Sequence, residues 1–308
     1  MKKYKLTKET LQFAGRTLHR IKAVKDFDSI KAGEFGGWIE NEKNLSQDDN
    51  AWIYGDAMVF DNAEVFDNAE VFDNAKVYRN ASVFGNAKVY RNASVFGNAK
   101  VYGNASVFGN AKVYRNANVF GYANVFGNAE VFDNAEVFDN AEVFDNAEVF
   151  DNANVFGYAN VFGNAEVYGN AKVYRNANVF GYANVFGNAS VFGNAEVYGN
   201  ASVFGNAEVY GNASVSDYAK VYGNAVIKGD AKVHDAVDYI VFKNFWSSGR
   251  YFTWTSSNNK WSVGCFYGTG EELIKKAYAD SEKSGREYER VVRYVESILA
   301  DEKKEKSN

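Results

Sequence analysis

Residues 57–68 read Ala-Met-Val-Phe-Asp-Asn-Ala-Glu-Val-Phe-Asp-Asn, which is one six-residue unit written twice. About 31 such hexads follow one another from Ile53 to Val233 with nothing inserted or deleted, and self-similarity at a fixed period is the signature of a repeat architecture. In each hexad Ala comes first, Val or Ile comes third, and Phe or Tyr is almost always fourth. A turn residue and Asn usually complete the unit. The sequence therefore predicts a repeat protein.

Each hexad has the pattern of a short strand followed by a corner. Residues two apart on an extended segment face the same side, so Ala and the aliphatic residue point inward while the variable and aromatic residues point outward. The pairs Gly-Asn, Asp-Asn or Arg-Asn then turn the chain, and we expect Asn to tolerate a left-handed backbone there. Corners of constant angle wind the chain into a prism whose faces stack turn upon turn.

Four corners carry Tyr in place of Asn. Because Tyr disfavours positive φ, we expect the preceding Gly to adopt the unusual dihedral, and Asp217 to do so less easily, which would distort its corner. These four tyrosines are Tyr122, Tyr158, Tyr182 and Tyr218.

The spacing of an aliphatic residue and a small residue four positions on, as in Val65 to Ala69 and Val161 to Ala165, resembles the hexapeptide-repeat family of left-handed parallel β-helices. The resemblance implies three faces, about 18 residues per turn and about ten coils, which at about 4.8 Å per coil gives a rod near 48 Å long. Its handedness follows from the resemblance alone. The expected fold is an all-β solenoid, a three-sided left-handed parallel β-helix with a small α+β cap at the C-terminal end.

The chain divides by composition into three parts. Residues 1–50 are expected to form an N-terminal cap and degenerate first coils, residues 51–235 the β-helix, and residues 236–308 the C-terminal cap. Counted back from Ala51 in steps of six residues, Leu45 and Ile39 fall at the positions that Ala occupies in the later hexads. The first coils should therefore begin near Gly36. A bare solenoid end exposes unpaired strand edges, which is the reason to expect caps.

The C-terminal cap should combine a small sheet with two helices. Residues 239–246, 250–255 and 260–266 are β-rich and aromatic, which predicts three strands. Thr269 and Glu272 form a capping-box pattern that opens a helix, and a second helix has an apolar stripe from Tyr288 to Leu299. The two ends of the chain resemble those of uncharacterised hexapeptide-repeat proteins that bacteriophages and prophages often encode.

Composition excludes several classes of function. The 308 residues carry a net charge of -5, so a nucleic-acid partner is not expected. The N-terminus lacks the apolar run of a signal peptide and no stretch is long enough to span a membrane, so we expect a cytoplasmic protein without a membrane partner. With one cysteine, Cys265, and two histidines, His19 and His234, the sequence offers no metal site and implies no cofactor.

Many hexapeptide-repeat proteins are acyltransferases, and the resemblance makes a divergent trimeric acyltransferase one alternative. Such enzymes typically use a His as general base, often on a loop that leaves the helix. The array has no loop insertion and no His before His234, which we interpret as a surface or packing residue. No catalytic residue is assigned, and a non-enzymatic protein is favoured.

Aromatic residues at the outward fourth position should line each face in columns. Contiguous exposed apolar surface marks partner sites, so these columns could bind a protein, mediate homo-oligomer formation or stack on a glycan. The alternative is that the rings stack on one another and shield the backbone. Tryptophans of the C-terminal cap could likewise line a groove or form its core. The candidate partner-binding residues are Tyr54, Phe72, Tyr90, Phe108, Phe126, Phe144, Trp246, Trp254 and Trp261.

An internal duplication indicates what the rod is used for. Residues 112–129 recur identically as residues 172–189, ten hexads later, and ten is not a multiple of three. The copy should therefore lie on a different face, which argues against one stereospecific site along the rod. We expect a rod-like scaffold whose caps and aromatic columns bind a macromolecule, a protein in the first place; a glycan-binding module is the second alternative.

Overall fold

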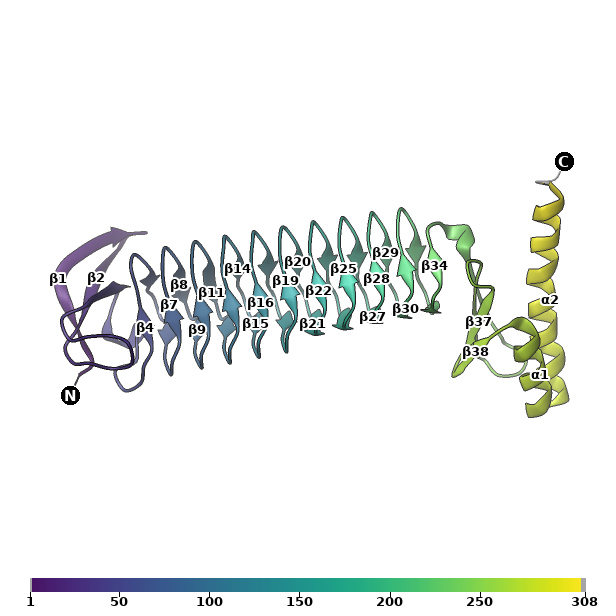
Figure 1. Cartoon of the computed structure of the whole chain (residues 1–308), viewed down its shortest axis with the longest axis horizontal. Helices are drawn as coiled ribbons and strands as arrows, with labels where there is room; N and C mark the ends of the chain where they lie inside the picture. The colour runs from purple at the N-terminus through teal and green to yellow at the C-terminus, as the bar shows by residue number, and fades with distance from the viewer. Residues whose placement is uncertain (1, 306–308) are drawn as a thin grey trace.

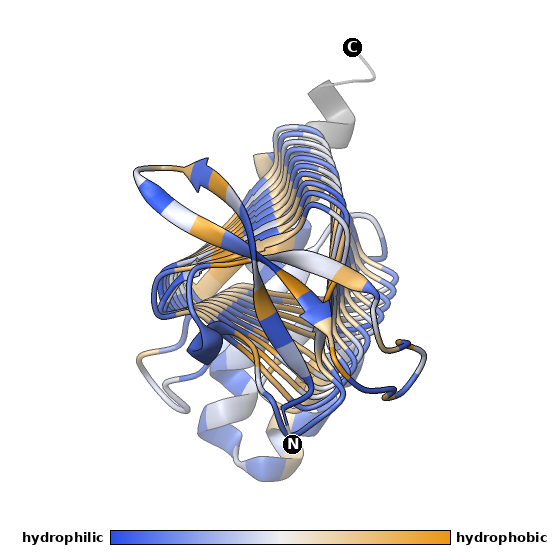
Figure 2. Ribbon diagram, turned by 90° about the vertical axis from the view of Figure 1, so that its left-hand side faces the viewer, coloured by the Kyte–Doolittle hydropathy of each residue, from blue (hydrophilic) through white to orange (hydrophobic). Residues whose placement is uncertain are grey.

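The computed structural model describes residues 2–305 and shows a long β-solenoid with a different small structure at each end (Figure 1). Three parallel sheets form its faces, and the view along the axis shows their three-sided outline (Figure 2). The solenoid is left-handed, as the resemblance implies. One sheet has 11 strands from first coil to last, so the expected architecture is confirmed with about one coil more than the ten expected.

The strands are short, most of them two residues long, and are joined by the corners. The 13-stranded sheet contains β1 (Tyr4–Phe13), β2 (Arg16–Ala23), β3 (Phe35–Ile39), β5 (Met58–Val59), β8 (Lys76–Arg79), β11 (Ser94–Gly97), β14 (Lys112–Val113), β17 (Glu130–Val131), β20 (Glu148–Val149), β23 (Glu166–Val167), β26 (Asn184–Val185), β29 (Ser202–Val203) and β32 (Lys220–Val221). The 11-stranded sheet contains β4 (Trp52–Ile53), β7 (Glu70–Val71), β10 (Lys88–Val89), β13 (Ser106–Val107), β16 (Asn124–Val125), β19 (Glu142–Val143), β22 (Asn160–Val161), β25 (Asn178–Val179), β28 (Glu196–Val197), β31 (Ser214–Val215) and β34 (Lys232–Val233). The 10-stranded sheet contains β6 (Glu64–Val65), β9 (Ser82–Val83), β12 (Lys100–Val101), β15 (Asn118–Val119), β18 (Glu136–Val137), β21 (Asn154–Gly157), β24 (Lys172–Arg175), β27 (Ser190–Gly193), β30 (Glu208–Gly211) and β33 (Val226–Gly229).

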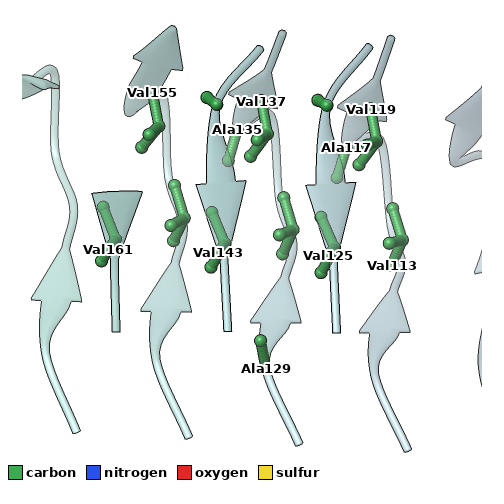
Figure 3. Packing of buried hydrophobic residues seen from close by; sticks show 14 of the residues in the cluster. Val113, Ala117, Val119, Val125, Ala129, Ala135, Val137, Val143, Val155 and Val161 are labelled. Carbon is green, nitrogen blue, oxygen red and sulfur yellow. The ribbon is translucent and has the colours of Figure 1, made fainter. Parts of the chain in front are cut away.

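The core is a column of Ala and Val side chains that fills the prism. Val113 and Ala117 have no exposed surface, and Figure 3 shows them pointing into the interior together with their neighbours from adjacent coils. Val113 pairs with Val131 in the next coil of the same sheet. Each fully buried Val stabilises the fold by about 1.5–3 kcal/mol relative to an exposed one, which helps to offset the entropy cost of ordering the backbone.

The corners differ from expectation in one respect. The left-handed residue is the fifth of the hexad and not the Asn, as shown by Asp61 at φ 61° and Arg115 at φ 61°. The prediction that Asn takes this conformation is therefore wrong. Asp217 adopts φ 56°, and the strands on both sides of its corner, β31 and β32, pair in register, so that corner is not distorted in the way we expected.

The N-terminal cap extends one face of the solenoid. Strands β1 and β2 form an antiparallel hairpin, and β3 pairs with β2 on one side and in parallel with β5 on the other. Ile39 lies opposite Val59 and Leu45 opposite Val65, so both occupy the aliphatic position of the hexad. The prediction that these two residues occupy the Ala position is therefore wrong. Leu45 and Ile53 are eight residues apart, whereas successive aliphatic positions are otherwise six apart, so the segment between them supplies the two extra residues of this coil. A short 3₁₀ turn at Glu42–Asn44 precedes Leu45.

The C-terminal cap packs on the last coil. Its antiparallel sheet has four strands, β35 (Tyr239–Lys243), β36 (Tyr251–Thr255), β37 (Lys260–Val263) and β38 (Phe266–Gly268), where three were expected, because the chain turns at residues 264–265. The 3₁₀ turn Ala236–Asp238 precedes this sheet, and helices α1 (Gly270–Asp280) and α2 (Glu282–Glu305) follow it. The capping box of Thr269 and Glu272 is present as predicted. Residue 1 and residues 306–308 of the two expected caps lie outside the described residues.

The duplicated block lies on two different faces, as predicted. Lys112 begins β14 in the 13-stranded sheet, whereas its copy, Lys172, begins β24 in the 10-stranded sheet. Among the described helices, none is long and apolar enough to cross a membrane.

Candidate functional site

Stacked aromatic rings run along all three faces of the solenoid. On the face of β4, the rings of Phe72 and Tyr90 are 4.7 Å apart and 5° from parallel, and those of Phe108 and Phe126 are 4.8 Å apart and 1° from parallel. Phe144 continues the same column. Each ring is half-buried because its neighbours cover both of its faces, so the columns present ring edges to solvent. The predicted columns are confirmed, while their role in partner binding remains a prediction.

The first ring of this column is turned out of the stack. Tyr54 stands at 88° to Phe72 with 6.3 Å between ring centroids, and its hydroxyl donates a hydrogen bond to Glu70 Oε1 at 3.3 Å. Burial raises the pKa of the Tyr54 hydroxyl, and the nearby Glu70 and Asp28 carboxylates raise it further. An open cleft of about 850 Å³ lies at this end of the column. Its lining comprises Tyr54, Gly55, Asp56, Glu70, Phe72, Asp73, Asn74, Arg91 and Asn92.

Amide ladders follow the corners of the solenoid and were missed by the sequence analysis. The side-chain amide of Asn92 donates to Asn110 Oδ1 at 3.2 Å, and that of Asn110 donates to Asn128 at 3.0 Å. Such chains explain why Asn recurs at the sixth position although it is not the left-handed residue. The 18-residue spacing of Asn in the sequence is the signal from which they could have been found.

The three tryptophans of the C-terminal cap fall into two groups. Trp254 and Trp261 are 3% and 2% exposed and pack with Phe252 and Val292 in the cap core. Their burial places both indole rings inside the cap, and a role of these two residues in partner binding stays a prediction. Trp246, in contrast, is 63% exposed and lies in the loop after β35.

An apolar groove forms where this loop meets α2. The groove has a volume of about 430 Å³ and lies against the face of α2 that carries Val291 and Tyr294. Tyr294 is 56% exposed, and Phe245, which precedes Trp246 in the chain, is 72% exposed. We call this surface the cap groove, and its lining is Phe242, Trp246, Glu287, Arg290, Val291 and Tyr294.

Polar residues replace the aromatic column at the C-terminal end of the β4 face. Ser216 and His234 occupy the ring positions there, and Nδ1 of His234 lies 2.7 Å from Ser216 Oγ and 3.2 Å from Asp217 Oδ2. Both partners contact the same ring nitrogen, so the three residues do not form a Ser-His-acid relay, in which the partners contact different nitrogens. The arrangement instead orients the imidazole by Nδ1, and Nε2 is the nitrogen available to a substrate proton.

Carboxylates also stack along one face. Glu130, Glu148 and Glu166 lie opposite one another in successive coils of the 13-stranded sheet. Burial raises the pKa of the Glu148 carboxyl, and the charges of Glu166 and Glu130 add to the effect. Lys112 offsets this repulsion at one end, where its ammonium is 2.7 Å from Glu130. Among residues 2–301, whose side chains the structure describes, no three His, Cys, Asp or Glu side chains converge as a metal site would require.

Comparison with models of known protein families finds no match. Over 62 residues the chain is 39% identical to an uncharacterized acetyltransferase, YdcK, of Escherichia coli (strain K12). This similarity covers 18% of the present chain and 19% of the relative, so it relates a segment of each protein and not their full lengths.

Proposed function

We propose that this chain is a non-enzymatic, rod-like hexapeptide-repeat protein that binds a protein partner through the cap groove. The observation that carries the proposal is the exposure of Trp246 and Tyr294 on either side of that groove. Large aromatic residues together with Arg are the residue types on which protein interfaces concentrate their binding energy, and Arg290 completes the set here.

The solenoid supports a role as a rigid spacer. Its 11-stranded sheet keeps the same pairing from β4 to β34, which separates its first and last strands by about 48 Å. Hydrogen bonds hold the C-terminal cap to the last coil, including one from the Tyr267 hydroxyl to the Lys228 carbonyl at 2.9 Å and one from the Tyr239 hydroxyl to the Lys220 carbonyl at 2.7 Å. The cap groove is thus held at a fixed distance from the N-terminal cap.

Site-specific crosslinking in the native host tests the proposal. A photoreactive phenylalanine analogue at position 246 should capture a protein that the same analogue at position 126, in the middle of a ring column, does not capture. The captured protein would then be purified, and Trp246→Ala should weaken its affinity about 30-fold, as for a hot-spot residue worth about 2 kcal/mol. Equal capture at both positions, or equal affinity of the variant, would contradict the proposal. Capture of a second copy of the chain would show that the cap groove mediates homo-oligomer formation.

A phage or prophage origin belongs to the same proposal and rests on the resemblance of the chain ends. The genes that flank this one provide the test. Phage structural, lysis or anti-defence genes nearby would support that origin, whereas a neighbourhood of housekeeping metabolic genes would count against it.

Acyl transfer at His234 is a second candidate function. It is supported by the similarity to an acetyltransferase over 62 residues and by the carboxylate of Asp217 beside Nδ1 of the imidazole. If this proposal is right, the protein should release coenzyme A from acetyl-coenzyme A in the presence of a panel of amines and hydroxyl acceptors. His234→Ala should abolish the release, while the neighbouring Lys232→Ala should not. Absence of release from the wild-type protein across the panel would remove this candidate.

A further inference from the structure

We propose that the cleft at the N-terminal end of the β4 aromatic column binds a neutral saccharide. The cleft has about 850 Å³ of space and is lined by two aromatic rings, Tyr54 and Phe72, together with polar side chains. This site lies at the opposite end of the rod from the cap groove, so the proposal does not depend on the partner proposed there.

The break in the ring column provides the stacking surface. Along the column from Phe72 to Tyr198 each ring lies within 8° of parallel to the next, whereas Tyr54 stands at 88° to Phe72. Phe72, the first ring of the parallel stack, therefore has no parallel neighbour on its N-terminal side, where Tyr54 makes only a T-shaped contact with it. The negative face of an aromatic ring attracts the weakly positive C–H groups on the flat side of a sugar ring.

The neighbouring face of the solenoid lacks such an opening. There the first ring, Phe60, is covered by Phe13 of β1 at 5.7 Å and an angle of 65°, and Phe60 itself is 4% exposed. The hairpin of β1 and β2 thus closes that column, while the β4 column ends in the cleft.

The polar lining suits hydroxyl groups. Asp56 and Asp73 offer only acceptors, and Arg91 offers only donors. The amides of Asn74 and Asn92 hydrogen-bond along the ladder, but each amide nitrogen carries a second donor hydrogen and each amide oxygen a second lone pair. A second recess of about 260 Å³ shares Glu70 with the cleft and is lined by further Asn side chains, so the polar surface continues beyond a single sugar ring. The combined size fits an oligosaccharide and exceeds what a small organic cation needs.

The charge of the lining indicates which saccharides are accepted. Three carboxylates, Asp56, Glu70 and Asp73, face one guanidinium, Arg91. The ammonium of Lys88 lies 2.7 Å from Glu70 and offsets that charge. The balance stays negative and disfavours phosphorylated, sialylated or uronic-acid sugars.

Saturation-transfer NMR and calorimetry with defined sugars test the proposal. The neutral probes are cellohexaose, chitohexaose and maltohexaose, the anionic probe is hexagalacturonate, and choline serves as the cationic probe. We expect at least one neutral hexasaccharide to bind and hexagalacturonate not to bind. Binding of only hexagalacturonate or choline, or no binding of any neutral probe at concentrations on the order of 10 mM, would overturn the proposal.

Three variants locate the site. Phe72→Leu should weaken binding about tenfold by removing the stacking ring, whereas Phe126→Leu, in the middle of the same column, should change affinity less than about twofold. Asp56→Asn introduces the residue that most other corners carry and should also weaken binding without loss of fold. If Phe72→Leu and Phe126→Leu weaken binding equally, the cleft is not the site. Thermal melting of each variant verifies that it is folded.

Discussion

The hydroxyl of Ser216 lies 2.7 Å from Nδ1 of His234, one coil further along, on the face where the preceding coils stack aromatic rings. Ser216 is buried, at 1% exposure, although its position in the hexad faces outward. Between the last two coils of this face a side-chain hydrogen bond thus takes the place of ring stacking, in addition to the backbone hydrogen bonds between β31 and β34.

Loss of this hydrogen bond should loosen the C-terminal end of the solenoid. Ser216→Ala should lower the local opening free energy by about 1 kcal/mol, because the part-buried hydrogen bond with Nδ1 of His234 is lost and coil stability depends on nearest neighbours. Faster hydrogen exchange in β31 and β34 would show the effect. Ser214→Ala, two residues earlier and half-buried, is the control and should leave exchange unchanged; equal effects of the two substitutions would contradict the prediction.

An interrupted amide ladder offers a matched pair of substitutions. Asn110→Ala removes two side-chain hydrogen bonds, to Asn92 and Asn128, and should lower the unfolding free energy by about 1 kcal/mol, since these amides are exposed. Asn140 has tyrosines one coil away on both sides, Tyr122 and Tyr158, so Asn140→Ala should have a smaller effect. Thermal melting of both variants tests the difference. If they melt together, the ladders contribute nothing to stability.

Stability should fall at alkaline pH because folded tyrosines hold their protons. Burial raises the pKa of the Tyr239 hydroxyl from 10.0 to about 12 and also raises the pKa of Tyr168. Such a group contributes stability fully below the unfolded pKa near 10, and the contribution is lost as pH rises through the folded pKa. Burial lowers the pKa of Lys3 and of Lys228, and these two groups act in the opposite sense.

Melting temperature measured from pH 8 to pH 12 tests this expectation, with absorbance at 295 nm reporting tyrosinate. The melting temperature should fall from about pH 10 upward, and Tyr239→Phe should make its decrease with pH less steep. A melting temperature that stays flat or rises through this range would contradict the assignment of raised tyrosine pKa values.

Contact between the cap and the last coil depends on one glycine. Gly229 has φ 68°, and a Cβ atom there would overlap the hydroxyl of Tyr267. Gly187 has φ 71°, and a Cβ atom there would meet backbone no closer than 3.1 Å. Both Gly→Ala substitutions incur the cost of a left-handed Ala, about 1 kcal/mol, but only Gly229→Ala should also displace the cap.

Limited proteolysis near residues 234–238 distinguishes these two variants. Cleavage there should accelerate in Gly229→Ala and stay at the wild-type rate in Gly187→Ala. Equal cleavage of Gly187→Ala and Gly229→Ala would show that the contact with Tyr267 is not responsible.

The solenoid could be predicted from the sequence because its contacts repeat at fixed intervals. Given 18 residues per turn, the stacking of Phe108 on Phe126 follows directly, as does the location of the duplicated block on a new face. The same period brings Ser216 next to His234, yet it gives no sign of the hydrogen bond between them. Local geometry was harder to predict. Asn at the sixth position was wrongly expected to be the left-handed residue of the corner, because both Gly and Asn tolerate that conformation.

The chain ends could be predicted only in part, since no period constrains them. The two extra residues between Leu45 and Ile53 lengthen the first coil and place Ile39 at the aliphatic position, which the six-residue period counted back from Ala51 does not indicate. The exposure of Trp246 and the burial of Trp254 depend on where α2 packs against the small sheet. Similarly, the cleft beside Tyr54 results from the orientation of one ring, and an aromatic residue fills the fourth position of that hexad as it does elsewhere.

Because the cross-section has three sides, each hexad advances the chain by one face and three hexads complete one turn of the solenoid. Adding three hexads would move the cap groove about 4.8 Å further from the N-terminal cleft without turning it, while adding one hexad would turn it by a third of a revolution. The duplicated blocks, ten hexads apart, are offset by three full turns and one such step. Gain or loss of hexads can thus change both the distance and the angle between two ligands held at opposite ends, without changing any residue that contacts either of them.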